Sequence, residues 1–416
     1  KVMYAYHNGT AWEIEEVDSS YNAYATTIDL DSSDGAHIAY GVLNNSDGNS
    51  YNMRYAYHNG TERVHEDIKD YKEVYSGFYT GYGGDIKLNS TDVPHVVFFD
   101  DNLDDVILSI RSNGSWSSAS VEGSDGNPVY GGYYTSYGER GASLAIDSSD
   151  GLHVAYYGMS SYSLEYTFSG DGGASWSSDS VHDQGTHNIG SSVSIAVDSL
   201  DRPHIAYYDR NQADLEYARH DGTDWFAETL EGYSNVGNFP SIAIDSADQV
   251  HIAYQNSSQS SLMSLVIGGG AVTEKVAQVG THSYGMGFDV GQSGSMHLSF
   301  YNGTDTQGSL QHATKVGRSW TVVTVDDSST MVGTHSDLAL GPNGNPHISY
   351  VDASNGLLRY AHHDGSSWTT STVDPSGSVI GFTSIEVDDD GFARIAYHDG
   401  SLRLASWNGS SWSLTT

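Results

Sequence analysis

Aromatic side chains gather in two stretches that interrupt an otherwise regular sequence. Residues 70–84 (DYKEVYSGFYTGYGG) and 122–141 (EGSDGNPVYGGYYTSYGERG) are rich in tyrosine and glycine. Tyrosine rings on glycine-rich loops are suited to stacking on sugars or to packing against a protein surface. The competing interpretation is a lid of loops that pack only on themselves. The candidate ligand-binding residues, including one histidine in a later link, are Tyr75, Phe78, Tyr79, Tyr82, Tyr133, Tyr134, Tyr137, Arg140 and His187.

Two further groups have the chemistry of metal ligands. The segment DDNLDD places Asp100, Asp101, Asp104 and Asp105 close together, and clustered carboxylates are the ligands that Ca²⁺ prefers. Their spacing does not fit an EF-hand, and solvated turns have the same composition, so a calcium site is one of two interpretations. The tripeptide GTH recurs at His187, His282 and His335, and three histidines facing one channel would ligate a transition metal.

The elements that position these residues follow from an internal repeat. Eight segments resemble DGLHVAY or DRPHIAY. Seven of them carry histidine at the same position, and the eighth carries Arg394. The spacing runs from 58 residues (His37 to His95) down to 46 residues (His251 to His297). A histidine that recurs seven times is a scaffold residue, because catalysis needs it once.

Each repeat contains four short strand patterns separated by polar, glycine-bearing turns. Four antiparallel strands in a unit of 40–50 residues predict the blade of a β-propeller. We therefore expect an all-β fold, a single propeller domain over residues 1–416, most simply with eight blades. Residues 1–18 match only the outer two strands of a blade and predict an extra hairpin available for self-assembly. The expected repeats cover 22–69, 83–122, 141–183, 191–231, 240–278, 284–327, 335–374 and 381–416.

Alternation along a strand assigns faces to the repeated residues. In HIAY, histidine and alanine share one face of the strand, and isoleucine and tyrosine share the other. In a blade of four consecutive strands, the 2–3 loops and the 4–1 links open on one side. The long stretches at 41–52, 70–84 and 122–141 fall in such loops and links of adjacent repeats. We therefore predict one shared binding surface.

The segment SGDGGASW (169–176) lies between the third and fourth strands of one repeat. It resembles the Asp-box of BNR-type propellers such as sialidases, with Ser169, Asp171, Gly173 and Trp176 at the matching positions. The resemblance implies a propeller fold and a structural turn. The arginine triad and the Tyr/Glu nucleophile pair of sialidases have no match among the few arginines, so that activity is not transferred.

The charge of the chain excludes several partners. The sequence holds 53 acidic and 17 basic residues, a net charge of −36. Phosphate backbones and anionic membranes need basic patches, so nucleic acid is excluded as a partner. There is no apolar run of transmembrane length, which predicts no membrane insertion. The chain has no cysteine, and several N-x-S/T sequons fit an extracellular or cell-surface location.

These features predict a non-catalytic β-propeller that binds a glycan or a protein. A second hypothesis is an enzyme on the same scaffold, a polysaccharide lyase or a glycoside hydrolase. In a lyase, Tyr134, Tyr137, Arg140 and His187 would supply the base, the acid and the positive charge. A third hypothesis is a structural module of a larger surface protein or filament.

Overall fold

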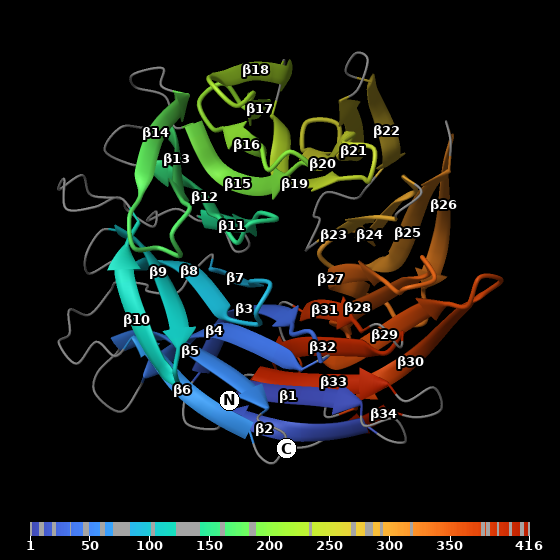
Figure 1. The fold of residues 1–416 in the computed structure, drawn as a ribbon. Helices are drawn as coiled ribbons and strands as arrows, with labels where there is room; N and C mark the ends of the chain where they lie inside the picture. Colours follow the sequence, from blue (N-terminus) through green and yellow to red (C-terminus); the bar gives the residue numbers. More distant parts are fainter. Residues whose placement is uncertain are drawn as a thin grey trace. The chain divides into compact units, whose positions relative to one another are not determined.

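The computed structural model consists of β-strands joined by turns (Figure 1). It describes residues 2–7, 12–18, 22–33, 35–44, 50–58, 63–69, 84–100, 105–121, 142–158, 163–182, 189–232, 235–267, 272–278, 286–291, 294–316, 319–375, 379, 383–388, 391–398, 402–407 and 412–414. Within these ranges no element is helical, and so none is a helix that could span a membrane.

The chain forms two compact units. Unit one comprises Lys1–Gly48, Arg54–Asp67 and Val276–Thr416, and unit two comprises Asn49–Met53 and Ile68–Lys275. Three strands cross these boundaries, and each is assigned to the unit that holds most of its residues. The strands of unit two are β7 (Asp85–Leu88), β8 (Pro94–Asp100), β9 (Asp105–Ser112), β10 (Ser115–Ser120), β11 (Ala142–Ile146), β12 (Leu152–Gly158), β13 (Ser163–Ser169), β14 (Ser177–His182), β15 (Ile189–Val197), β16 (Pro203–Asp209), β17 (Asp214–His220), β18 (Trp225–Glu231), β19 (Val236–Ile244), β20 (Val250–Asn256), β21 (Ser261–Ile267) and β22 (Val272–Gln278).

These sixteen strands pair, in chain order, into four antiparallel sheets of four strands each. The first strands β7, β11, β15 and β19 lie along the inner side, and the fourth strands lie outermost (Figure 1). Side chains of one inner strand hold the next: the Asp85 carboxylate on β7 accepts a hydrogen bond from the Leu144 backbone N–H on β11 at 3.2 Å. This is the arrangement of successive propeller blades.

Unit one repeats the same pattern. Its strands are β1 (Val2–His7), β2 (Trp12–Asp18), β3 (Asn22–Leu30), β4 (Ala36–Asn44), β5 (Ser50–His58), β6 (Arg63–Lys69), β23 (Met286–Val290), β24 (Met296–Gly303), β25 (Gly308–Val316), β26 (Ser319–Asp326), β27 (Val332–Leu340), β28 (Pro346–Asp352), β29 (Leu357–His363), β30 (Trp368–Asp374), β31 (Thr383–Val387), β32 (Ala393–His398), β33 (Leu402–Trp407) and β34 (Trp412–Leu414). They form four sheets of four strands, and β1 pairs with β2 as a separate two-stranded hairpin.

Burial explains why these segments stack as sheets. Every residue of PHIAYYD in β16 is buried, which is what a strand covered on both faces by neighbouring sheets requires. Strand β18 is the outermost strand of its sheet, and most of its residues are exposed. The buried tyrosines of the repeat are the largest side chains of the core, and Tyr207 and Tyr217 are at most 1% exposed.

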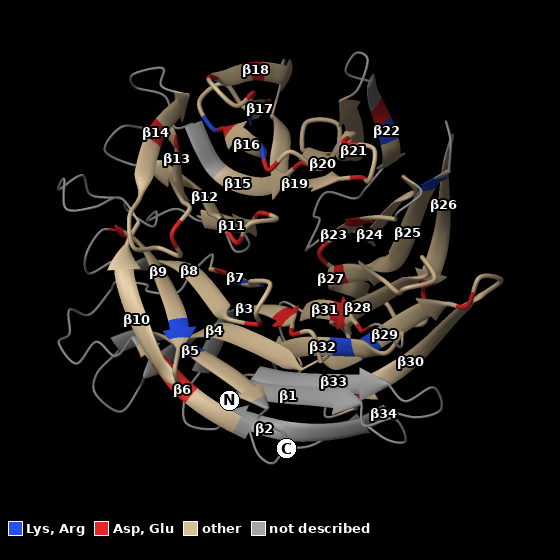
Figure 2. Cartoon of the chain, in the orientation of Figure 1, with Lys and Arg blue, Asp and Glu red and all other residues tan. Residues whose placement is uncertain are grey.

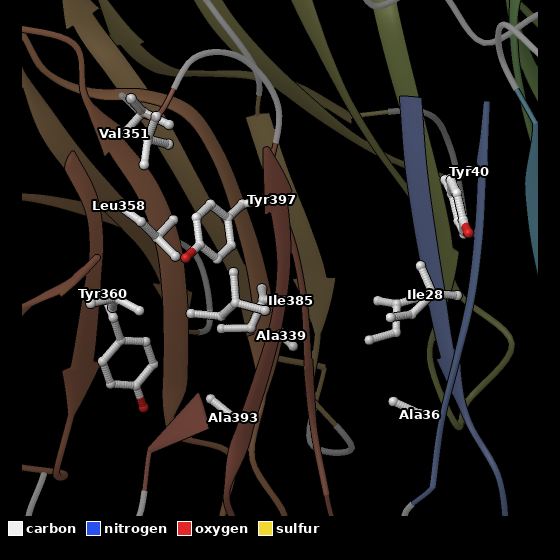
Figure 3. Packing of buried hydrophobic residues seen from close by; sticks show 14 of the residues in the cluster. Ile28, Ala36, Tyr40, Ala339, Val351, Leu358, Tyr360, Ile385, Ala393 and Tyr397 are labelled. Carbon is white, nitrogen blue, oxygen red and sulfur yellow. The ribbon is translucent and has the colours of Figure 1, made fainter. Parts of the chain in front are cut away.

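Figure 3 shows one core cluster, which lies within unit one. Ile28 and Tyr40 from sheet β3–β6 approach Ile385 and Tyr397 from sheet β31–β34, with Leu358 from sheet β27–β30 alongside. Ile28 and Ile385 come from first strands, and the same cluster contains Ile38 and Ile395 from the second strands. Isoleucine and tyrosine of each second strand therefore share one core cluster, as the alternation in HIAY predicts.

Three inner strands begin earlier than the repeat predicts, and backbone bulges explain the difference. The repeats expected from residues 191, 240 and 335 begin at Ile189, Val236 and Val332, and the pairing register shifts in all three strands. At the bulge of β19, Gly237 and Phe239 have φ of 99° and 52°, and at the bulge of β27, Gly333 and His335 have φ of 103° and 53°. A bulge adds residues without changing the side-chain pattern downstream, so alternation alone does not place the start of the strand.

The predicted fold class, an all-β propeller of four-stranded antiparallel blades, is confirmed. Over the described residues there are eight four-stranded sheets and one two-stranded hairpin, four sheets in each unit. The closure of all of them into one eight-bladed ring, and self-assembly through residues 1–18, stay predictions.

Candidate functional site

The recurring histidine lies in a buried Asp–His–Tyr group that resembles a catalytic triad. In sheet β11–β14 the two ring nitrogens of His153 have different partners: Nε2 lies 3.1 Å from Asp147 Oδ2, and Nδ1 lies 2.7 Å from the Tyr166 hydroxyl. The β11–β12 turn positions the carboxylate, because Asp147 Oδ1 accepts the N–H groups of Ser149 and Gly151. Asp147 Oδ2 is thereby directed at the imidazole.

The same group recurs in other sheets. His204 contacts Asp198 at 3.3 Å and Tyr217 at 2.5 Å. His37 contacts Asp31 at 3.1 Å and Tyr55 at 2.5 Å.

Electrostatics and burial identify this group as a scaffold. Burial lowers the pKa of His153, and burial also raises the pKa of the Tyr166 phenol. Burial acts to raise the pKa of Asp147 as well, but the hydrogen bonds from His153, Gly151 and Ser149 outweigh it and the pKa is lowered. A phenol with a raised pKa, buried beside a neutral imidazole, is not an activated nucleophile. The group ties the turn, the second strand and the third strand together, as the repetition predicts.

The Asp-box turn is also structural. Asp171 Oδ1 accepts hydrogen bonds from the Ser169 hydroxyl at 2.8 Å and from the Ser175 N–H at 2.9 Å, and Gly173 has φ of 85°. The hydrogen bonds from Ser175 are the main reason that the pKa of Asp171 falls to about 2. The ring of Trp176 packs against the core shared with sheet β7–β10.

Most of the predicted site residues lie outside the residues that the structure describes. These are Tyr75, Phe78, Tyr79, Tyr82, Tyr133, Tyr134, Tyr137, Arg140, His187, His282, Asp101 and Asp104. Asp100 ends β8, Asp105 begins β9, and His335 lies in the bulge of β27. No cluster of three or more potential metal ligands occurs among the described residues, and the calcium and transition-metal sites stay predictions.

The structure does describe where the two aromatic insertions enter the sheets. The insertion at 70–84 leads into β7 and the insertion at 122–141 leads into β11. Asp85, the first residue of β7, lies against the start of β11: its Oδ2 is 3.2 Å from the Leu144 nitrogen and 3.5 Å from the Ser143 hydroxyl. The Asp85 side chain is buried at this junction. Both insertions therefore reach the inner strands within a few residues of one another.

The contact between sheets β11–β14 and β15–β18 differs from the equivalent contact in unit one. In unit one, Asp326 at the end of β26 accepts a hydrogen bond from the Tyr350 hydroxyl at 2.6 Å and pairs with Arg359 at 3.0 Å. In unit two, His182 stands in the place of Asp326, 2.7 Å from the hydroxyl of Tyr207.

The residue that corresponds to Arg359 is also different in unit two. Glu216 replaces Arg359, and it accepts a hydrogen bond from the Thr229 hydroxyl at 2.7 Å. Burial is the main cause that raises the pKa of Glu216 to about 7, and the neighbouring Asp209 and Asp214 add to it. This inverted charge was not among the sequence predictions. The sequence does indicate it, because glutamate stands at position 216 where the later repeat has arginine at position 359.

Comparison with known proteins adds the following. No family model matches the chain, and no curated protein matches it. A six-bladed β-propeller lectin from Aleuria aurantia is 13% identical, with 66% of this chain and 93% of that chain covered and a TM-score of 0.41. The lectin SapL1, solved with α-methyl fucoside, is 11% identical over 71% of this chain and 98% of its own, with a TM-score of 0.43. An intramolecular trans-sialidase from Ruminococcus gnavus is 10% identical over 82% and 92%, with a TM-score of 0.42. No functional residue is transferred from structures this distant.

Proposed function

We propose that this chain is a propeller module that binds a glycan or a protein without catalysis, through the surface formed by residues 70–84 and 122–141. The observation that carries the proposal is the contact between Asp85 and Leu144, because it fixes the entry points of both insertions on adjacent inner strands. Loops that start from a rigid scaffold are where binding residues are commonly found.

The composition of the two insertions indicates the ligand. Between them they carry eight tyrosines and one phenylalanine, together with many glycines. Tyrosine supplies contact area at low cost in side-chain entropy, and its ring stacks on the apolar face of a sugar. Figure 2 shows acidic residues distributed through the turns of both units, with far fewer basic ones. A net charge of −36 repels anionic polysaccharides, so neutral glycans are the first class to test.

The test is a neutral-glycan array followed by calorimetry on the best ligand. The variants are Tyr79→Ala, Tyr134→Ala and Tyr137→Ala, and each loss of a stacking contact is expected to weaken binding by about 1–3 kcal/mol. The control is Phe226→Ala, which removes an exposed aromatic ring from β18, a strand of a different sheet from β7 and β11. Unchanged melting temperatures with weakened binding support the proposal.

Two results contradict it. If the tyrosine variants unfold the protein, the insertions are core packing. If binding to an identified ligand survives all three changes, the ligand site lies elsewhere. Turnover of a bound glycan would instead favour the enzyme hypothesis. A calcium ion at Asp100, Asp101, Asp104 and Asp105 and an extracellular location belong to this proposal as untested parts.

A further inference from the structure

Two histidines pack on one tryptophan, and a third histidine pairs with one of them, where sheet β23–β26 meets sheet β27–β30 within unit one. His297 Nδ1 lies 3.2 Å from His312 Nε2, and both side chains are buried. The His312 ring packs on the Trp368 ring from the next sheet, with centroids 4.9 Å apart. His363 covers the same tryptophan at 5.2 Å. Trp368 thus joins the two sheets through imidazole rings.

Unit two contains the matching arrangement with different side chains. Between sheets β11–β14 and β15–β18, His153 contacts Tyr166, and the Tyr166 ring packs on Trp225 at 4.8 Å. His220 covers Trp225 at 5.3 Å. In this interface a phenol stands where unit one has His312.

The turn residue differs as well. Asp147 holds Nε2 of His153, but Gly291 takes the equivalent place six residues before His297. The Nε2 atom of His297 instead lies 3.2 Å from the Ser295 hydroxyl. The unit-one interface therefore has one more imidazole and one less carboxylate than its counterpart.

The charged groups around the unit-one histidines have other partners. Asp289 on β23 lies opposite His297, but its carboxylate accepts the N–H groups of Val290 at 2.7 Å and Leu340 at 3.0 Å. Asp364 in the β29–β30 turn accepts the N–H groups of the serines that follow it, and it lies close enough to His363 to attract a positive charge there.

Lys315 follows His312 by three residues on β25, and its ammonium group lies 6.0 Å from the centroid of the Trp320 ring. Among the described residues, neither His297 nor His312 forms a hydrogen bond with a carboxylate.

We propose that the contact between sheets β23–β26 and β27–β30 is an acid-sensitive latch, which opens when His297 and His312 take up protons, while the matching contact in unit two stays closed. Two imidazolium ions at 3.2 Å repel each other, with no carboxylate between them. In unit two burial also lowers the pKa of His153, but the Asp147 carboxylate at 3.1 Å opposes that shift and would attract the protonated ring.

Proton linkage gives the direction of the effect. Burial lowers the pKa of His297 to about 4 and that of His312 to about 3, and neighbouring histidines add to the shift. In an opened interface both rings regain an ordinary pKa of about 6.5. The closed form therefore binds fewer protons than the open form below pH 6.5, and the free energy that favours the closed form falls as pH decreases. The equilibrium constant for opening rises by up to about tenfold per histidine for each unit by which the pH is lowered.

Hydrogen exchange measured by mass spectrometry tests the latch in the unmodified protein. Peptides from β24, β25 and β30 are compared with peptides from β12, β13 and β18 at pH 7 and pH 5, after correction for intrinsic exchange rates. We expect the protection of the unit-one peptides to fall at least about tenfold more than that of the unit-two peptides. An equal change in the two sets overturns the proposal.

Two double variants test whether these residues cause the response to pH. Gly291→Asp with His312→Tyr installs the unit-two residues in unit one, and it should abolish the extra response at pH 5. Gly291 is not among the residues with positive φ, and an added Cβ is too close only to the Ser295 hydroxyl, at 2.6 Å, whereas Leu340 and the Ser295 carbonyl oxygen lie at an ordinary contact distance of 3.6 Å. The reverse exchange, Asp147→Gly with Tyr166→His, should transfer the acid response to sheets β11–β18.

If the first variant keeps the full response, the histidines are not its cause and the latch is wrong. If either variant fails to fold, the comparison of the two units within the unmodified protein still decides the question. Binding through residues 70–84 and 122–141 is measured separately at pH 7, so the failure of one proposal leaves the other intact.

Discussion

Ser148 and Asp201 join two neighbouring sheets of unit two through a pair of parallel hydrogen bonds. The Ser148 N–H donates to Asp201 Oδ1 at 3.0 Å, and its hydroxyl donates to Oδ2 at 2.8 Å. Ser90 with Asp150, and Ser199 with Asp248, repeat the contact between the adjoining pairs of sheets. Each aspartate has positive φ, which is 59° at Asp201. The first turn of one sheet is therefore held by the first turn of the next.

Removing the carboxylate of Asp201 should loosen this contact. We expect Asp201→Ala to lower the free energy of unfolding by about 1–2 kcal/mol, because two charge-assisted hydrogen bonds are lost and alanine tolerates positive φ poorly. Asp201→Asn keeps an acceptor and the backbone preference, so it should cost less. Urea denaturation measures both variants. An alanine variant as stable as the unmodified protein would show that the hydrogen bonds from Ser148 to Asp201 contribute nothing to stability.

The ring of Trp225 carries a second contact between sheets. It packs on Tyr166 of the preceding sheet, and its Nε1–H donates to Asp179 at 3.2 Å. Trp225 is half-buried, so Trp225→Ala should cost about 2 kcal/mol, less than the roughly 3–5 kcal/mol of a fully buried tryptophan. The neighbouring Phe226 is 47% exposed, and Phe226→Ala should change the thermal midpoint little. Equal costs for the two variants would contradict this assignment.

Glu216 should weaken the fold near neutral pH. Its pKa of about 7 means that the folded protein keeps the proton between about pH 4.5 and 7, whereas the unfolded chain releases it. The free energy of unfolding therefore falls as pH rises through this window, by about 3 kcal/mol in total. Glu216→Gln should remove this dependence and stabilise the protein at pH 7 and above.

The control for this change is Glu228→Gln on the exposed surface of β18, which should leave the pH dependence as it is. Denaturant midpoints at pH 5, 6, 7 and 8 give the comparison. A Glu216→Gln variant that is less stable than the unmodified protein at pH 8 would mean that the carboxylate is ionised and paired.

Salt should stabilise the whole chain. With a net charge of −36, self-repulsion opposes the folded state and is screened by added ions. We expect the melting temperature to rise with NaCl between low ionic strength and about 0.5 M. A rise at micromolar CaCl₂ that NaCl of equal ionic strength does not reproduce would support the calcium site at Asp100, Asp101, Asp104 and Asp105. No response to either salt would refute both expectations.

Sequence patterns predict the local structure of this protein well, for identifiable reasons. The alternation in HIAY indicates a strand and assigns its two faces, because successive side chains point to opposite sides of a strand. The SGDGGASW turn is equally local, since Ser169, Asp171 and Gly173 lie within five residues and form its hydrogen bonds themselves. Eight copies of one pattern are then enough to predict four-stranded propeller blades.

The partners of these residues depend on register and on how the sheets stack. His153 finds Asp147 in a turn and Tyr166 thirteen residues later only because three strands align in one register. Trp225 packs on a ring in the preceding sheet as well as on His220 in its own hairpin. The pairing of His297 with His312, and of Asp85 with Leu144, likewise joins separate strands. Residue type and spacing determine which face of a strand a side chain occupies, whereas the tertiary structure alone decides which neighbour it meets there.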